Sequence, residues 1–530
     1  ARAGSRYGFS LDGGPPLADP RAESQPDGVQ GLSEVVDHDA FVWHDAAWRG
    51  RELAGSVLYE CHVGTFSTAG TFDAMVRRLP HLVDLGVDAV ELMPVASFPG
   101  RRGWGYDGVC LYAPHTPYGG PDGLKRLVDA CHGAGLAVVL DVVYNHMGPG
   151  SRLHEFGPYL TDEHRTAWGQ AMNFEGRGSD EVRRFVVDNA CMWVRDYHVD
   201  GLRLDAVHAI TDRSALHVVE QLASEVGALA ESLGSTVTVI AESDLNDPRF
   251  VRPPGLGGYG CDAAWADDWH HALHAVLTGE RDGYYEDFGE LDQLAKSLAQ
   301  AWVYDGRRST FRGAIHGRPA TGVRPHQFVV ATQNHDQVGN RARGERLAHL
   351  TTPGRVKVAA ALLLTSAFTP MLFQGEEWAA SSPFQYFTDH DDPETARAVT
   401  EGRRREFEQF EWGPDEVPDP QDPRTFERSR LRWDELGRAD HAEVLEWYRT
   451  LLSLRRAHAS LREDAAPEVR VDVEAATLVV ARGELEVLVN LGPGPWHATA
   501  GGEVLTSSDP LVQQRCGELV LPPDAVAIRR

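Results

Sequence analysis

The feature that most constrains the fold of this chain is a series of eight short apolar runs that alternate with longer segments. The runs occupy residues 56–64, 88–95, 136–146, 199–207, 236–243, 262–268, 327–336 and 369–377. Their near-continuous apolar character is typical of strands buried on both faces of a parallel sheet. Predicted helices lie between them, for example over 122–135, with Asp122 as N-cap, and over 179–198. Eight strands alternating with helices predict an α/β fold, a closed (β/α)8 TIM barrel.

The sequence on either side of this pattern differs from it. Residues 1–50 are rich in Gly, Pro and Asp without a helical period, so we expect a truncated β segment, the tail of an N-terminal β module. After a predicted helix at 441–461, Val- and Leu-rich runs separated by Gly and Pro predict an antiparallel β domain. We therefore predict three parts: residues 1–50, a catalytic barrel with insertions at 51–464, and a C-terminal β domain at 465–530.

The net charge of the 530-residue chain is −27, and no run of Lys or Arg forms a basic stripe. Such a charge repels nucleic acid and anionic membranes and favours a neutral substrate. The six cysteines lack CxxC spacing and sit mostly in apolar segments, which indicates reduced, buried thiols. No signal peptide or transmembrane segment is visible. We therefore predict a cytoplasmic protein without a membrane or nucleic-acid partner.

Polar residues occupy the carboxyl ends of several predicted strands, which is where barrel enzymes place their chemistry. They are Asp141 and His146 after the third strand, Arg203 and Asp205 after the fourth, Glu242 after the fifth, and His335 and Asp336 after the seventh. Any one of them alone is more often a helix cap, a salt-bridge partner or a structural histidine. Together, at four strand ends, they predict one catalytic centre.

Two of these carboxyl groups suit the cleavage of a glycosidic bond. The two-residue period of a strand puts Arg203 and Asp205 on one face, with Leu202 and Leu204 toward the helices, and the guanidinium favours an ionised nucleophile. Glu242 follows the apolar run TVTVIA, so burial would keep it protonated as a general acid. Hydrolysis with retention needs such a pair, about 5–5.5 Å apart. Asp336 would add a third charge that holds sugar hydroxyls.

Four short motifs carry a resemblance to a known family. They are DVVYNH at 141–146, GLRLDAVH at 201–208, AES at 241–243 and QNHD at 333–336. In order and strand position they resemble the four motifs of the α-amylase superfamily, glycoside hydrolase family 13. The resemblance implies that Asp205 is the nucleophile, Glu242 the acid/base and Asp336 the transition-state stabiliser.

The same resemblance implies further contacts with the substrate. It places Arg203, His146 and His335 on the sugar at the cleavage point, and GWGYDG at 103–108 implies that Tyr106 stacks on that sugar. Substrate contacts are also expected of His208, Trp104, Trp269 and Glu376. Asp141 and Asn145 are expected to be structural. In many α-amylases the counterpart of Asn145 binds calcium, but the other ligands of that site cannot be placed here, so no metal and no cofactor is predicted.

A narrower resemblance is to the maltooligosyltrehalose trehalohydrolases. The stretches that carry it are MPVASFPGRRGWGYDGV, QNHDQVGNRARGERL and PMLFQGEEWAASSPFQYFTDH. The resemblance implies hydrolysis of the α-1,4 bond next to the trehalose end of a maltooligosyl trehalose, as in trehalose biosynthesis.

Three other functions are weighed against this one. An α-amylase, a glucosidase or a branching enzyme would share the catalytic trio and differ in its loops. A glucan-binding barrel without activity would be expected to lack a catalytic carboxylate, whereas all three are present. A metal-dependent hydrolase could use Asp141, His146, Asp205 and His335 as ligands, but Arg203 beside a dication is unfavourable.

Overall fold

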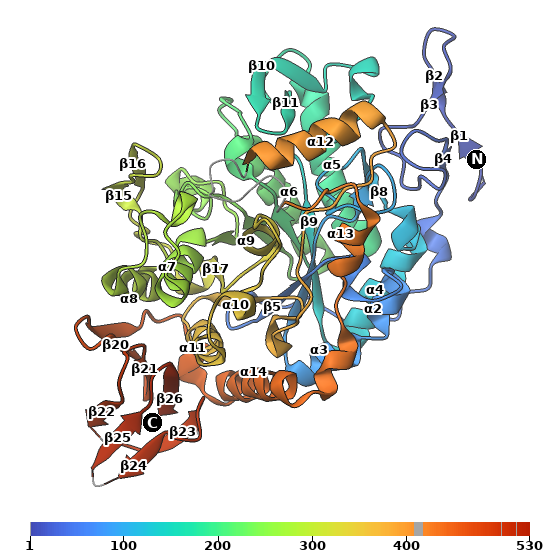
Figure 1. The fold of residues 1–530 in the computed structure, drawn as a ribbon. Helices are drawn as coiled ribbons and strands as arrows, with labels where there is room; N and C mark the ends of the chain where they lie inside the picture. Colours follow the sequence, from blue (N-terminus) through green and yellow to red (C-terminus); the bar gives the residue numbers. More distant parts are fainter. Residues whose placement is uncertain (1, 407–416, 500, 516) are drawn as a thin grey trace.

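All eight predicted strands form, and they close into a parallel barrel at the centre of the molecule (Figure 1). The computed structural model describes residues 2–406, 417–499, 501–515 and 517–530. The barrel strands are β5 (Leu58–Cys61), β6 (Ala89–Leu92), β9 (Ala137–Val142), β12 (Gly201–Leu204), β13 (Thr238–Ala241), β14 (Ala263–Trp265), β17 (Phe328–Ala331) and β18 (Thr369–Phe373). They follow one another around the barrel in chain order, so the fold prediction is confirmed.

Helices form an outer layer around this barrel. They include α3 (Leu79–Leu85), α4 (Gly120–Gly133), α5 (Ser179–Tyr197), α6 (Val218–Leu233), α7 (Asp267–Thr278), α8 (Leu291–Gln300), α11 (Pro353–Leu364) and α14 (Ala439–Ala457). The prediction that Asp122 caps α4 is wrong: the helix begins at Gly120, because Pro121 fits the first turn, and Asp122 lies inside that turn.

Side chains of the barrel strands alternate between the barrel interior and the helix layer. On β12, Leu202 and Leu204 lie in the apolar layer beneath the helices, as predicted, and Arg203 therefore points inward. Apolar residues such as Leu58, Ile240 and Met371 fill part of the interior. The register of the ladder pairs Glu60 with Glu91 and Asp141 with Arg203, so charged residues form part of the barrel core.

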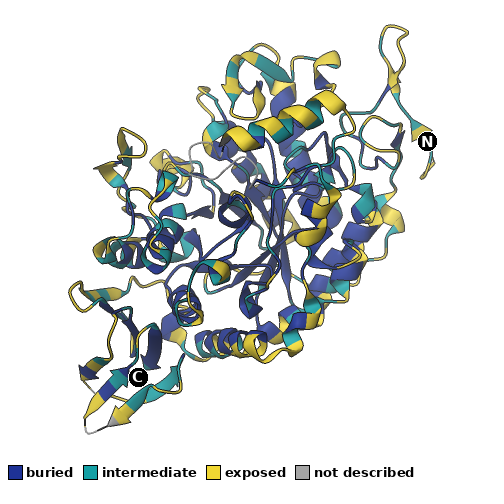
Figure 2. Cartoon of the chain, in the orientation of Figure 1, coloured by how far each residue is buried: buried dark blue, intermediate teal, exposed yellow. Residues whose placement is uncertain are grey.

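Several insertions surround one mouth of the barrel. The hairpin of β10 (Leu160–Thr166) and β11 (Gly169–Met172) follows β9, and the hairpin of β15 (Asp305–Arg308) and β16 (Ile315–Gly317) follows α8. Helix α12 (Pro393–Glu406) and the short helices α9 (His335–Gly339) and α13 (Pro423–Arg428) also belong to this group. Figure 2 shows exposed residues on the two hairpins, α12 and α13, whereas α9 and the barrel strands are mostly buried.

The ends of the chain form small antiparallel sheets. Near the N-terminus β1 (Arg6–Tyr7) pairs with β4 (Ser33–Glu34), and β2 (Phe9–Ser10) with β3 (Pro16–Leu17). The C-terminal strands are β19 (Glu468–Asp472), β20 (Thr477–Arg482), β21 (Leu485–Asn490), β22 (Trp496–Thr499), β23 (Val504–Ser507), β24 (Gln513–Arg515), β25 (Glu518–Leu521) and β26 (Ala525–Arg529). They form a five-stranded and a three-stranded sheet, and β21 and β26 contact α11.

The fold bears on two sequence predictions, the absence of a membrane-spanning segment and the reduced state of the cysteines. Among the described residues, no helix combines the length and apolar character needed to cross a bilayer. Cys61, Cys110, Cys131, Cys191 and Cys261 are free thiols, and all but Cys191 are buried. Cys516 lies outside the described residues.

Candidate active site

The candidate site is organised around one guanidinium at the mouth of the barrel. Arg203 is fully buried, and its Nη1 atom lies 2.9 Å from Oδ1 of Asp205. Its Nη2 atom lies 3.7 Å from Oε2 of Glu242. The two carboxyl groups predicted to be catalytic therefore share one cation. Their side chains are 12% and 13% exposed, which leaves both within reach of a substrate.

Asp141 holds this guanidinium from the neighbouring strand. Both of its carboxylate oxygens accept hydrogen bonds from Arg203 Nη1, at 2.9 and 2.8 Å. The cation also lies over the ring of Trp265, with 4.2 Å between Cζ and the ring centroid. Burial raises the pKa of Asp141 to about 6, although Arg203 acts to lower it. Asp141 is thus an anion at neutral pH that fixes the orientation of Arg203.

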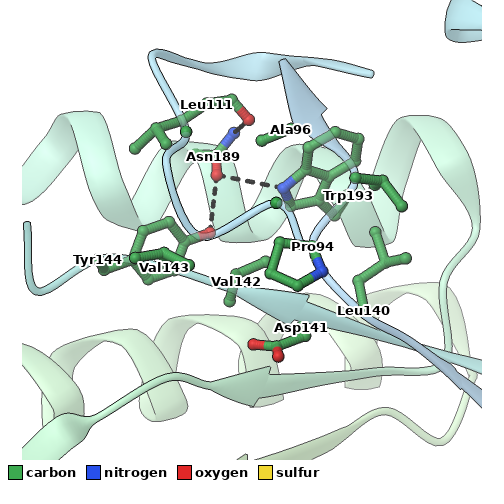
Figure 3. A pocket seen from close by; sticks show the side chains of 13 residues that line it. Pro94, Ala96, Leu111, Leu140, Asp141, Val142, Val143, Tyr144, Asn189 and Trp193 are labelled. Atoms are coloured by element: carbon green, nitrogen blue, oxygen red, sulfur yellow. Dashed lines mark hydrogen bonds between the residues drawn. The ribbon is translucent and has the colours of Figure 1, made fainter. Parts of the chain in front are cut away.

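The strand end that carries Asp141 is supported from behind by a hydrogen-bonded cluster (Figure 3). Tyr144 and Trp193 both donate to Oδ1 of Asn189, at 2.7 and 3.1 Å, and Asn189 in turn donates to the carbonyl oxygen of Leu111 at 3.0 Å. Because Tyr144 immediately precedes the next two polar residues of the site, this cluster fixes their position.

Those two residues, Asn145 and His146, reach into the site from the end of β9. The amide of Asn145 donates to the carboxylate of Asp205 at 2.7 Å and to its backbone carbonyl at 2.9 Å. His146 donates a hydrogen bond from Nδ1 to the side-chain amide oxygen of Asn145, and its ring stacks on Trp168 at a centroid distance of 5.4 Å. Asn145, predicted only as structural, thus contacts the candidate nucleophile directly.

Glu242 has a different environment from Asp205. Its Oε2 atom accepts a hydrogen bond of 2.5 Å from the backbone N–H of Ala206. Ala206 has a φ of +41°, a strained conformation for a residue with a Cβ that aims this N–H at the acid. Burial raises the pKa of Glu242 well above its usual range, Arg203 acts to lower it, and Asp205 and Asp336 raise it further. The net effect favours the protonated form of Glu242, which a general acid requires.

Asp336 is the most open of the three carboxyl groups. It lies in the first turn of α9, where Asn334 caps the helix, and its side chain is 42% exposed. Its Oδ1 atom lies 3.5 Å from Nε2 of His335 and accepts a 3.3 Å hydrogen bond from Asn340. The charges of Asp205 and Asp336 both act on Glu242, so the three carboxyl groups lie close enough to interact at the carboxyl ends of the barrel strands.

Further polar groups lie beyond Glu242. His208 is exposed on the turn Val207–Ala209, 3.9 Å from Asp244, and Arg312 forms a 2.8 Å ion pair with the same Asp244. At the start of α7, burial raises the pKa of Asp267 to about 7, and the charge of Asp336 raises it as well. These groups form a polar rim on the side of the general acid.

Two predicted substrate contacts are wrong. Trp269 is fully buried in the apolar layer between strands and helices, so its ring has no face for a sugar. Glu376 is 3% exposed and accepts hydrogen bonds from Thr332 at 2.5 Å and Tyr448 at 2.8 Å. Both lie just after barrel strands in sequence, but Trp269 belongs to the first turn of α7 and Glu376 to a short 3-10 helix, and both side chains are buried.

The aromatic residues of the GWGYDG stretch have separate positions. Trp104 is 5% exposed, stacks on Phe384 and meets His335 edge-on, so it supports the site from behind. Tyr106 is partly exposed, and its hydroxyl donates to Asp141 at 2.6 Å. Its ring stacks on that of His335 at a centroid distance of 5.2 Å. Tyr106 is therefore the more exposed of the pair and the one that contacts both Asp141 and His335.

Sequence reasoning missed two residues of this region. Glu60 binds His335 from the barrel interior, and a charged residue inside the apolar run SVLYECHVG was the available signal. Trp168, 54% exposed in the turn of the β10–β11 hairpin, carried no signal, because only the fold brings it onto His146.

The described part of the chain offers two groups of side chains with spacing suited to a metal ion. They are Glu23 with His38 and Asp196, and Glu163 with His164 and Glu175. Neither group includes Asn145 or a catalytic carboxylate. In the second group Arg213 already pairs with Glu175.

Comparison with known proteins agrees with this geometry. Residues 25–156 match the sequence model of the alpha-amylase catalytic domain, and residues 461–528 match that of a domain of unknown function, DUF3459. The crystal structure of an alpha-amylase-type protein from Salmonella typhimurium superposes with a TM-score of 0.91 at 37% identity, over 100% of this chain and 91% of that one.

Two named relatives are similar over most of their length. The malto-oligosyltrehalose trehalohydrolase of Arthrobacter ramosus is 54% identical over 92% of this chain and 85% of the relative. That of Rhizobium sp. (strain M-11) is 48% identical over 99% of this chain and 89% of the relative. The barrel and its paired carboxyl groups define a glycoside hydrolase of the α-amylase superfamily. Within that superfamily, the chain belongs to the malto-oligosyltrehalose trehalohydrolase family.

Proposed function

We propose that this enzyme hydrolyses, with retention, the α-1,4 bond next to the trehalose end of a maltooligosyl trehalose, releasing trehalose and a shorter maltooligosaccharide. The observation that carries the mechanism is the position of Arg203, which contacts both Asp205 and Glu242 while their surroundings differ. Asp205 is held by cationic and amide donors, whereas Glu242 is buried in a way that favours its neutral form. The names of the relatives support the choice of substrate.

In the first step Asp205 is the nucleophile and Glu242 the acid. A carboxylate oxygen of Asp205 attacks the anomeric carbon, the bond from that carbon to the bridging oxygen breaks, and Glu242 gives its proton to the bridging oxygen. Trehalose leaves with that proton. The remaining glucan is bound covalently to Asp205, and Glu242 is left as a carboxylate.

In the second step the same groups act in reverse. The Glu242 carboxylate takes a proton from water, the water oxygen attacks the anomeric carbon, and the bond to Asp205 breaks. The sum of the steps adds one water molecule and preserves the α configuration. Asp336 is proposed to bind the sugar hydroxyls and to stabilise the positive charge that develops on the ring.

The polar rim beyond Glu242 is proposed to receive the trehalose unit. The general acid stands on the leaving-group side of the bond, so the groups next to it face the leaving disaccharide. His208, Asp244, Arg312 and Asp267 supply both donors and acceptors at this position. Such a mixture suits the hydroxyls of a sugar that has no reducing end.

Three further expectations are retained as proposals. We propose the division into residues 1–50, 51–464 and 465–530, supported by the small antiparallel sheets found near each end of the chain, before and after the barrel. We also propose a cytoplasmic location, supported by the free thiols of the described residues. Finally, we propose that the substrate is an oligosaccharide and not a nucleic acid, which is supported by the net charge of −27.

The proposal is tested by product analysis on two matched substrates, maltopentaosyl trehalose and plain maltopentaose. We expect free trehalose from the first as the main disaccharide and a much lower rate on the second. Comparable rates on both would instead indicate an α-amylase or glucosidase. New α-1,6 bonds in the products would indicate a branching enzyme.

A further inference from the structure

The proton positions around His335 can be worked out from the hydrogen bonds that reach it. Asp141 is paired with Arg203 through both oxygens and can only accept. The hydroxyl of Tyr106 therefore donates its single proton to Asp141, at 2.6 Å. Nε2 of His335 lies 2.7 Å from the same hydroxyl oxygen. Since Tyr106 has no second proton, His335 must be the donor in that contact.

The other ring nitrogen of His335 faces an acceptor as well. Nδ1 lies 2.5 Å from Oε1 of Glu60, and the backbone N–H of His335 donates to Oε2 of the same carboxylate at 2.9 Å. Both side chains are 1% exposed. A histidine that donates from both ring nitrogens is an imidazolium. Glu60 comes from β5, 275 positions away along the chain, and lies on the barrel-interior side of His335.

We propose that Glu60 is a positioning residue that keeps His335 as an imidazolium, so that its Nε2–H is donated to the Tyr106 hydroxyl and a positive charge lies beside Asp336. This inference rests on the proposed function, because it assigns a purpose to a group beside the proposed catalytic residues. Charges of alternating sign then follow one another from Glu60 through His335 to Asp141, Arg203 and Asp205, with the Tyr106 hydroxyl joining His335 to Asp141. The His335 cation also lies 3.5 Å from the carboxylate of Asp336.

Charged and titratable groups surround His335 on every packed side. The acidic groups are Glu60 on β5, Asp336 on α9, Glu91 on β6 and Asp141 on β9. Two basic residues, Arg203 on β12 and His62 after β5, oppose a positive charge on His335. The hydroxyl of Tyr106 completes the surroundings. Burial lowers the pKa of His335, but Asp336 and Glu60 outweigh it and raise the pKa to about 9.

The chain supplies a matched control in Glu91. It pairs with Glu60 in the ladder and is also 1% exposed, but neither of its carboxyl oxygens has a hydrogen-bond partner among the described residues. Burial raises the pKa of Glu91 well above its usual range, with Glu60 as the next cause. These surroundings favour the neutral form of Glu91. Glu91→Gln is therefore a size-matched replacement of a buried carboxyl group that has no hydrogen bond to His335, whereas Glu60→Gln removes the carboxyl group that bonds His335.

The deciding experiment is an NMR titration of the intact protein labelled at the histidine rings, with the His335 signal identified by its loss in His335→Gln. In the wild type we expect an imidazolium at pH 7 and 8. In Glu60→Gln we expect the midpoint to fall by about one pH unit or more, because an opposite charge at hydrogen-bond distance is removed. In Glu60→Asp, which keeps the charge, the midpoint of the His335 titration should lie close to that of the wild type. In Glu91→Gln the midpoint should equal the wild-type value.

A neutral His335 at pH 7 in the wild type would overturn the proposal. This measurement uses only the wild-type protein, so it does not depend on whether the Glu60→Gln variant folds. An equal shift in Glu60→Gln and Glu91→Gln would overturn it as well. The titration needs no turnover, so it separates this inference from the proposed function, which fails if maltopentaosyl trehalose yields no trehalose.

Hydrolysis provides the second measurement. We expect the ratio of kcat at pH 8 to kcat at pH 6 to be at least about fivefold lower in Glu60→Gln than in Glu91→Gln, because only the first lets His335 lose its proton in this range. A uniform loss at both pH values would indicate a merely structural role and would contradict the proposal.

Discussion

Asn145 holds Asp205 through both hydrogens of its side-chain amide, one on the carboxylate at 2.7 Å and one on the backbone carbonyl at 2.9 Å. Arg203 contacts the other carboxylate oxygen at 2.9 Å. Both oxygens of the proposed nucleophile are thus held before a substrate arrives. Orientation of this kind reduces the reorganisation that the reaction would otherwise require.

We expect Asn145→Ala to lower kcat/KM by about 10- to 100-fold, since a hydrogen bond to a charged group contributes about 1.5–3 kcal/mol. Steady-state kinetics on maltopentaosyl trehalose would measure this. The control is Asn173→Ala, which removes a buried amide that also bonds two backbone carbonyls but lies outside the site. It should lower Tm and leave kcat unchanged; equal kinetic losses in the two variants would contradict the assignment.

The roles of Asp205 and Glu242 can be separated with a substrate whose leaving group needs no proton. We expect Asp205→Asn and Glu242→Gln each to reduce turnover of maltooligosyl trehalose by roughly 10⁴-fold or more, with Tm near that of the wild type. On maltosyl fluoride, Glu242→Gln should retain much more of its activity than Asp205→Asn. Near-normal turnover in either variant, or the same relative loss on both substrates, would argue against this mechanism.

Two tryptophans should respond in opposite ways to replacement by alanine. Trp168 is 54% exposed and stacks on His146, so Trp168→Ala should raise KM about 2- to 10-fold with little change in Tm. Trp269 is fully buried, so Trp269→Ala should destabilise the fold by about 3–5 kcal/mol. Thermal unfolding and KM measured on both variants would decide. The reverse pattern would restore Trp269 as a sugar contact.

The attachment of residues 45–48 to the barrel should depend on the protonation of His132. This histidine lies 2.9 Å from both Asp45 and Asp200 and stacks on Trp48, which ties residues 45–48 to the barrel. Burial lowers the pKa of His132, but Asp200 and Asp45 outweigh it, and the net pKa is raised. The stabilisation is therefore complete below the unfolded value of about 6.5 and is lost as pH rises through the folded value.

The difference in Tm between the wild type and His132→Gln should accordingly be largest near pH 6 and shrink toward pH 9. His44→Gln is the control, because His44 also pairs with an aspartate, Asp129, but its side chain is 77% exposed and should contribute little. A difference that grows with pH would contradict the raised pKa of His132.

The sequence alone placed the strands and the residues at their carboxyl ends. Apolar runs and the two-residue period of a strand are local properties, and the parallel arrangement of a barrel gathers every strand end at one mouth. For this reason Arg203, Asp205 and Glu242 could be expected to meet before their contacts were known. The inward direction of Arg203 followed from the same alternation.

The tertiary structure decided how deeply each side chain is buried and which distant residue it meets. Trp269 and Glu376 follow barrel strands just as the residues of the candidate site do, but the folded chain buries both of them. The contact of Glu60 with His335 joins positions 275 residues apart through a closed barrel. The residue periodicity of a single strand or helix cannot predict a contact between such distant positions. Burial and charge pairing depend on neighbours that the chain brings together only when it folds.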